Sequence, residues 1–140
     1  MQIESNTGLD ELVLEFEACT LTHERWTHAA HLSVAAAYSI RFGDEALERM
    51  RAGIQRLNAV HGVEQTLSGG YHETLTVVWM RLVQHALAAT PNESEAWERV
   101  KAVVEALNDK KVVLNHYSRE AIMSPQARFA WLEPDLAPLP

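Results

Sequence analysis

The chain has 140 residues, of which 47% are hydrophobic and 22% are charged, and its formal net charge is −7. This length and composition are typical of a globular protein, so we predict a single helical domain over residues 1–140. An acidic chain argues against a nucleic-acid surface, and the one basic pair, Lys110-Lys111, is too small to form one. No secretory signal is visible, and no apolar stretch approaches the ~20 residues of a membrane span. We therefore expect a soluble, cytoplasmic protein without a membrane partner.

The pattern of apolar residues has helical periodicity throughout, without strand alternation or an internal repeat. The first three helices are predicted at about residues 8–20, 27–42 and 44–61. Gly43 and Gly62 follow the second and third helices, where glycine commonly ends a helix, and Asp44 is a candidate cap for the third. The only cysteine, Cys19, excludes an internal disulfide and continues an apolar stripe of the first helix, which predicts packing rather than a reactive thiol.

The second half of the chain follows the same pattern. A loop over residues 63–70 precedes a fourth helix at about 71–89, which is apolar on more than one side and is therefore expected at the centre of the bundle. A fifth helix follows the turn at residues 91–94, and shorter helical segments are expected near 112–117 and after Ser124. We predict an all-α, compact bundle of five main helices, with one or two short C-terminal helices and an extended proline-containing tail. Because Leu136 and Leu139 alternate with prolines, the tail is expected to lie ordered across the bundle and to be a candidate cover for the site.

Three histidines open two inward-facing helical stripes. His28 and His31 are three residues apart and therefore share one helix face, which continues through Ala35 and Tyr38. His72 begins a second stripe at the start of the fourth helix. If the second and fourth helices are roughly parallel, their histidines meet at one end of the bundle, in a pocket also bounded by Tyr71. Each histidine has an alternative interpretation as a core residue hydrogen-bonded to backbone or tyrosine.

Two neighbours of His72 complete the candidate site. Glu73 points about 100° away from His72 on a helix and is either a ligand or acid/base group, or a first-turn acid that stabilises the helix dipole. Tyr71 is a candidate hydrogen-bond partner of the histidines or of Glu73. The candidate catalytic residues are His28, His31, Tyr71, His72 and Glu73.

Known metal and catalytic motifs are absent. The segment from His23 to His28 fails the zincin pattern, because its second histidine comes one residue too late to share a helix face with the first. No phosphate-binding glycine loop and no serine-nucleophile elbow is present. The residues suit instead a mononuclear site of two or three histidines plus one carboxylate. In it His28, His31 and His72 hold one divalent transition metal, and Glu73 is a ligand or a base.

Several short motifs occur in a recognisable order, from Trp26-x-His28-x-x-His31-Leu32 through Gly70-Tyr71-His72-Glu73-Thr74 to Pro134-Asp135-Leu136-x-Pro138-Leu139-Pro140. In this respect the chain resembles a group of short, uncharacterised bacterial proteins. The resemblance covers most of the chain from residue 26 onward and implies a complete bacterial protein. It implies no activity, cofactor or substrate.

The sequence is consistent with three alternative functions. The first is a small-molecule enzyme with its site between the second and fourth helices, using either a metal ion or a histidine as general base. The second is a non-catalytic protein that binds or senses a small ligand, whose polar groups the histidines recognise. The third is a protein-interaction module that uses exposed tryptophans and the proline-containing tail.

Overall fold

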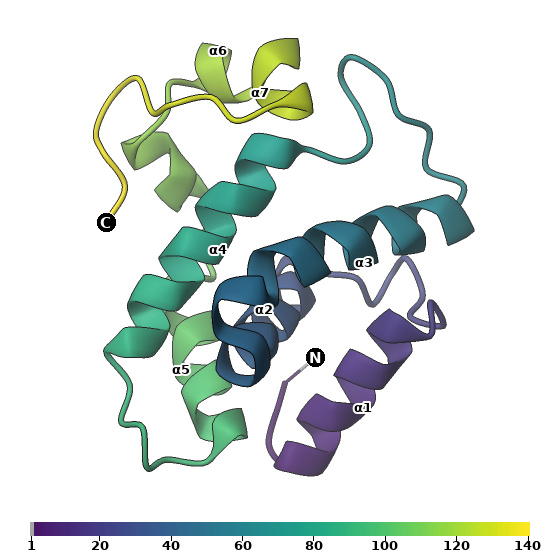
Figure 1. The fold of residues 1–140 in the computed structure, drawn as a ribbon, viewed down its shortest axis with the longest axis vertical. Coiled ribbons are helices and arrows are strands. Elements are labelled where there is room, and N and C mark those ends of the chain that lie inside the picture. The colour runs from purple at the N-terminus through teal and green to yellow at the C-terminus, as the bar shows by residue number, and fades with distance from the viewer. Residues whose placement is uncertain (1) are drawn as a thin grey trace.

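The computed structural model describes residues 2–140 and contains five long helices and four short ones (Figure 1). The long helices are α1 (Asn6–Glu17), α2 (His28–Phe42), α3 (Ala46–Val60), α4 (Glu73–Ala88) and α5 (Ala96–Leu107). The short ones are the 3₁₀ helices η1 (Gly43–Glu45) and η2 (Lys110–Asn115), and the α-helices α6 (Arg119–Ile122) and α7 (Pro125–Phe129). Within the described residues there is no strand, which confirms the all-α prediction. No helix there is both long and apolar enough to pass through a bilayer.

The central helix is α2, and the expectation that α4 holds this place is wrong. α2 packs against all four other long helices, whereas α4 packs against α2, α3, α5 and α7. In Figure 1, α2 lies behind α3, between α1 and α4. Four of the buried residues of α2 are alanines, which let neighbouring helices approach closely but add little hydrophobic signal: Ala30, Ala35, Ala36 and Ala37.

The helix ends show which local signals the chain uses. Gly43 and Gly62, with φ of +56° and +69°, follow α2 and α3 as predicted. The side chain of Ser124 caps α7 by accepting a hydrogen bond from the Ala127 amide. Asp44 does not cap α3, because the chain passes directly from α2 through η1 into α3.

Phe16 ties α1 to the elements that form the site. Its ring lies against Gly53 of α3 so closely that a Cβ atom at that position would come within 2.4 Å of the ring. The same ring stacks on Trp26, with 5.0 Å between the ring centroids. Trp26 precedes α2, so this packing sets the position from which α2 begins.

The C-terminal segment folds over the N-terminal end of α4 (Figure 1). Thr74 of α4 holds it by accepting a hydrogen bond from the amide of Leu132 and donating one to the carbonyl of Ala130. Further along, the amide of Leu136 donates to the carbonyl of His116 at 3.0 Å. Leu139 packs against the core, whereas Leu136 is 59% exposed. The tail is therefore ordered, as its leucine and proline spacing predicts, and only one of the two leucines packs.

Candidate functional site

A cavity of about 730 Å³ lies where α2, α3 and α4 meet the short C-terminal helices. His28, His31, Tyr71 and His72 all line it, so the structure brings four of the five predicted site residues around one space. Glu73 is not among the lining residues. The remaining wall is largely apolar, and its larger members are Trp26, Leu32, Met50, Ile54, Leu75, Trp79, Met80, Leu114, Ile122 and Met123. No residue after Arg128 lines the cavity, so the tail does not cover it.

His72 is the N-cap of α4. Its Nδ1 accepts a hydrogen bond from the Leu75 amide at 3.1 Å, and its Nε2 donates to the Ile122 carbonyl at 2.7 Å. These two bonds require one protonated and one unprotonated nitrogen, which is the neutral form of the ring. Burial lowers the pKa of His72, although the bond to Ile122 opposes that effect. Both ring nitrogens of His72 are therefore engaged in hydrogen bonds that hold the backbone of the protein together.

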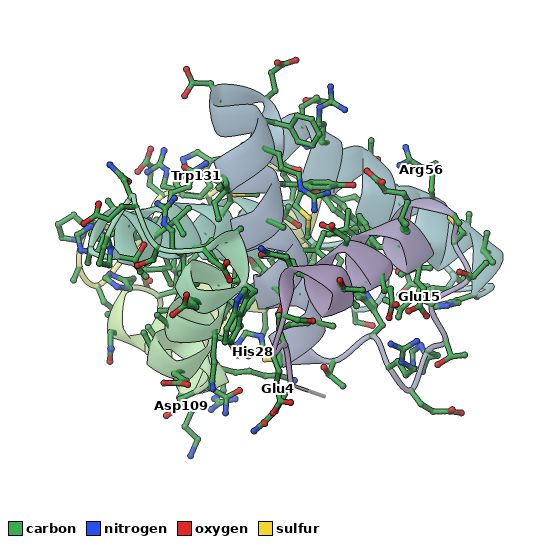
Figure 2. All side chains as sticks on the ribbon, turned by 90° about the horizontal axis from the view of Figure 1, so that it is seen from below. Glu4, Glu15, His28, Arg56, Asp109 and Trp131 are labelled. Atoms are coloured by element: carbon green, nitrogen blue, oxygen red, sulfur yellow. The ribbon has the colours of Figure 1, made fainter. Side chains whose placement is uncertain are left out.

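His28, the first residue of α2, has one ring nitrogen engaged. Its Nε2 donates to the carbonyl of Leu107, the last residue of α5, at 3.0 Å. The ring also meets Trp79 of α4 edge to face, with 4.6 Å between centroids. Figure 2 shows His28 on the side of the molecule that carries Asp109, close to that end of α5. Burial lowers the pKa of His28, and the charge of Lys110 adds to the lowering. The neutral ring then keeps Nδ1 as a hydrogen-bond acceptor.

His31 lies one turn further along α2 and is half-buried. Its ring packs on Trp26 at 3.8 Å between centroids. Burial, followed by the charges of His28 and Lys110, lowers the pKa of His31 to about 3. Within residues 2–140, the rings of His28 and His72 form hydrogen bonds but the ring of His31 has no such partner. His31 is thus a neutral imidazole at physiological pH with a donor and an acceptor available at the cavity.

Tyr71 and Glu73 belong to a network with Arg51 of α3. The Tyr71 hydroxyl donates to Glu73 Oε1 at 2.7 Å, and Arg51 donates to both carboxylate oxygens at 2.9 and 2.7 Å. The hydrogen bonds from Arg51 hold the pKa of Glu73 below its ordinary value. Burial and the bond to Glu73 raise the pKa of Tyr71 to about 12. Glu73 therefore joins α4 to α3 as an ionised partner of Arg51.

The donors do not converge as a metal site. Across residues 2–140, no group of three or more His, Cys, Asp or Glu side chains is placed to hold a metal ion. Using His72 as a ligand would break the cap of α4 or its bond to Ile122, because each nitrogen is already engaged. Among the described residues, the arrangement leaves His28 and His31 as the imidazoles of the cavity that have a free nitrogen.

Four cationic residues of the cavity were missed from the sequence. Lys110 and Lys111 of η2, Arg119 of α6 and Arg128 of α7 all line it. The sequence interpretation assigned the Lys110-Lys111 pair no role. The two arginines are separated from each other by residues 120–127, none of which is basic, so no local signal connects them with the lysines.

Comparison with known proteins gives no family to assign. No protein-family model, no curated protein and no solved structure matches the chain.

Proposed function

We propose that this protein binds a small, largely apolar organic molecule in the cavity, and that His28 and His31 hydrogen-bond its polar group. The volume of about 730 Å³ lies within the range of small-molecule sites, about 300–1,000 Å³. Such sites combine a mainly apolar wall with a few polar groups that orient the ligand. The observation that carries the proposal is that two imidazoles with free nitrogens face one cavity of this size.

The two imidazoles suit recognition because the protein holds them neutral and in place. The bond to Leu107 fixes which nitrogen of His28 is the acceptor, and packing on Trp26 orients His31. A neutral imidazole can donate to one ligand atom and accept from another. Their two rings therefore recognise a polar group without placing a charged imidazolium in a largely apolar cavity.

Isothermal titration calorimetry with naphthalene-2-carboxamide, a neutral probe with an apolar body, tests this proposal. We expect saturable binding at one site, weakened at least about tenfold by Leu75→Trp, because the larger ring occupies the cavity that Leu75 lines. Leu14→Trp is the matched control, since Leu14 is 64% exposed and lies outside the cavity. This variant should bind like the unaltered protein.

Two outcomes would contradict the proposal. One is the absence of binding up to about 1 mM by the unaltered protein, for this probe and for its carboxylate counterpart alike, which corresponds to a free energy weaker than about −4 kcal/mol. The other is equal binding by Leu75→Trp and the unaltered protein, provided that thermal unfolding shows both to be folded. The second result would place the probe outside the cavity.

Catalysis is the second candidate, and His31 is the observation that favours it. Its ring has no hydrogen-bond partner in the described chain and lies at a cavity that can hold a substrate. An efficient general base has a pKa near the working pH, whereas the pKa of His31 is about 3. Catalysis by this residue therefore requires a bound substrate to raise that pKa. An NMR titration of the His31 ring with ligand bound measures whether it does.

A metal-dependent version has less support. Catalytic zinc sites commonly use three protein ligands, and His28 and His31 are two. A transition-metal ion here would need a third donor from the ligand itself. Direct titration with Zn²⁺, with His31→Ala as the comparison, tests this version.

A further inference from the structure

The charges around the cavity are segregated. The whole chain has 19 acidic residues and 12 lysines and arginines. Nevertheless, the cavity wall within residues 2–140 contains four of these cations and no Asp or Glu. When all the charged residues that line a cavity are cations, the local potential there is positive. In this acidic protein that potential is opposite in sign to the net charge.

These four cations lack ion-pair partners inside the protein. The ion pairs of the described chain involve Arg25, Arg41 and Arg51, and none involves a cation of the cavity. Arg128 donates through Nη1 to the Gly70 carbonyl at 2.8 Å, while its Nε is buried without a hydrogen-bond partner. A buried donor without an acceptor is costly, so an acceptor supplied by a ligand would be favourable.

The cations of the cavity all come from the short C-terminal helices, whereas the long helices provide most of its apolar wall. η2, α6 and α7 contribute the charges, whereas α2, α3 and α4 contribute most of the apolar and aromatic surface. The charge of Lys110 also contributes to lowering the pKa of both His28 and His31, after the larger effect of burial. The positive potential therefore extends to the two imidazoles that the proposed function uses.

Resting on that proposed function, we propose that the ligand is an organic oxyanion with an apolar body, such as an aromatic or aliphatic carboxylate. Its apolar part would pack against the wall formed by α2, α3 and α4. Its anionic group would face Lys110, Lys111, Arg119 and Arg128. Guanidinium groups pair with carboxylate and phosphate through directed hydrogen bonds, whereas ammonium groups act as point charges, and this cavity offers both.

Matched anionic and neutral probes test the charge preference. Calorimetry compares naphthalene-2-carboxylate with naphthalene-2-carboxamide, and octanoate with octanamide, and 2-naphthyl phosphate shows whether a phosphate serves equally well. We expect each carboxylate to bind at least about tenfold more tightly than its amide, with the difference decreasing as salt is added. Because both members of a pair share one apolar body, the difference reports the polar group, and the part of it that decreases with added salt reports the charge.

The test variant removes three exposed charges of the cavity wall, Lys110→Gln, Lys111→Gln and Arg119→Gln. We expect it to lose most of the preference for the carboxylates, with unchanged affinity for the amides. Arg128 is kept because its bond to Gly70 supports the loop that precedes α4.

A control variant makes the same change in net charge at three exposed positions outside this cavity, Arg56→Gln, Arg81→Gln and Lys101→Gln. This control variant should keep the full preference for carboxylates over amides. Equal affinity of carboxylate and amide, or a preference that survives in the test variant, would overturn the oxyanion proposal and leave the proposed function standing. If no probe binds at all, the proposed function fails and this inference fails with it.

Discussion

His72 shows how one side chain can look like a site residue and act mainly in the fold. Its imidazole joins the start of α4 to α6, because one nitrogen caps the helix and the other binds the Ile122 carbonyl. Both bonds depend on the neutral ring. Protonation would place a hydrogen on Nδ1, facing the Leu75 amide, and would abolish the cap. By contrast, the ring of His31, which lines the cavity, has no such bond to any residue from 2 to 140.

Removing the His72 side chain should destabilise the protein. We expect His72→Ala to lower the free energy of unfolding by about 2–4 kcal/mol, because it removes an N-cap and leaves a carbonyl without its partner. His72→Asn should recover part of the loss, since asparagine also caps helices. Urea unfolding measures these differences. The control is His85→Ala at an exposed position of the same helix, and a loss at His72 no greater than the control's would refute the capping role.

At the scale of elements, the C-terminal tail acts as a strap rather than as a lid. Asp135 accepts a hydrogen bond from the Ser118 amide at 2.8 Å, and His116 bonds to the carbonyl of Pro138. These contacts hold α6 and η2, the elements that carry Arg119, Lys110 and Lys111. The tail thus supports the cationic wall from outside the cavity.

Truncation after Glu133 should therefore lower the free energy of unfolding, by about 2–3 kcal/mol, through lost hydrogen bonds and lost apolar burial. Leu139→Ala should account for about 1–2 kcal/mol of this loss, because Leu139 packs against the core. Leu136→Ala is the matched control at an exposed position and should change stability by less than about 0.5 kcal/mol. Thermal and urea unfolding measure all three, and an unchanged unfolding curve for the truncated chain would contradict the role of the tail.

At the scale of the whole molecule, the neutral histidines make stability depend on pH. The pKa of each of His28, His31 and His72 is lowered on folding, so below the ordinary value of 6.5 the unfolded chain binds protons that the folded chain does not. Stability then rises with pH over this range and is lost as the pH falls. For His31, whose folded pKa is about 3, the range extends from about 6.5 down to about 3.

We therefore expect the free energy of unfolding to fall steadily as the solution is acidified below pH 6.5, by at most about 1.4 kcal/mol per pH unit for each histidine. His31→Gln should reduce that slope, because glutamine does not titrate. His85→Gln, at an exposed position outside the cavity, is the matched comparison for this replacement, and the reduction at His31 should exceed the one at His85. Urea unfolding over a pH series measures the change of unfolding free energy with pH. A slope that His31→Gln does not alter would contradict the assignment of a low pKa to His31.

Features that depend on residues close together in the chain were predictable from the amino-acid sequence. Helical periodicity located the five long helices, and Gly43, Gly62 and Ser124 marked helix boundaries, because these signals act within one or two turns. It also singled out His28, His31 and His72, which line one cavity. Asp44 failed as a cap because its backbone continues directly into the next helix.

The chemistry of the cavity depends instead on contacts between distant parts of the chain. The bond from His72 to Ile122 spans 50 residues, and the one from His28 to Leu107 spans 79. The cationic wall arises because η2, α6 and α7 all meet the long helices at the cavity, which no spacing along the chain reveals. Periodicity reports which face of a helix is apolar, but it does not report which distant segment packs there. Hydrogen-bond partners and local potential depend on that packing, so they are decided when the chain folds.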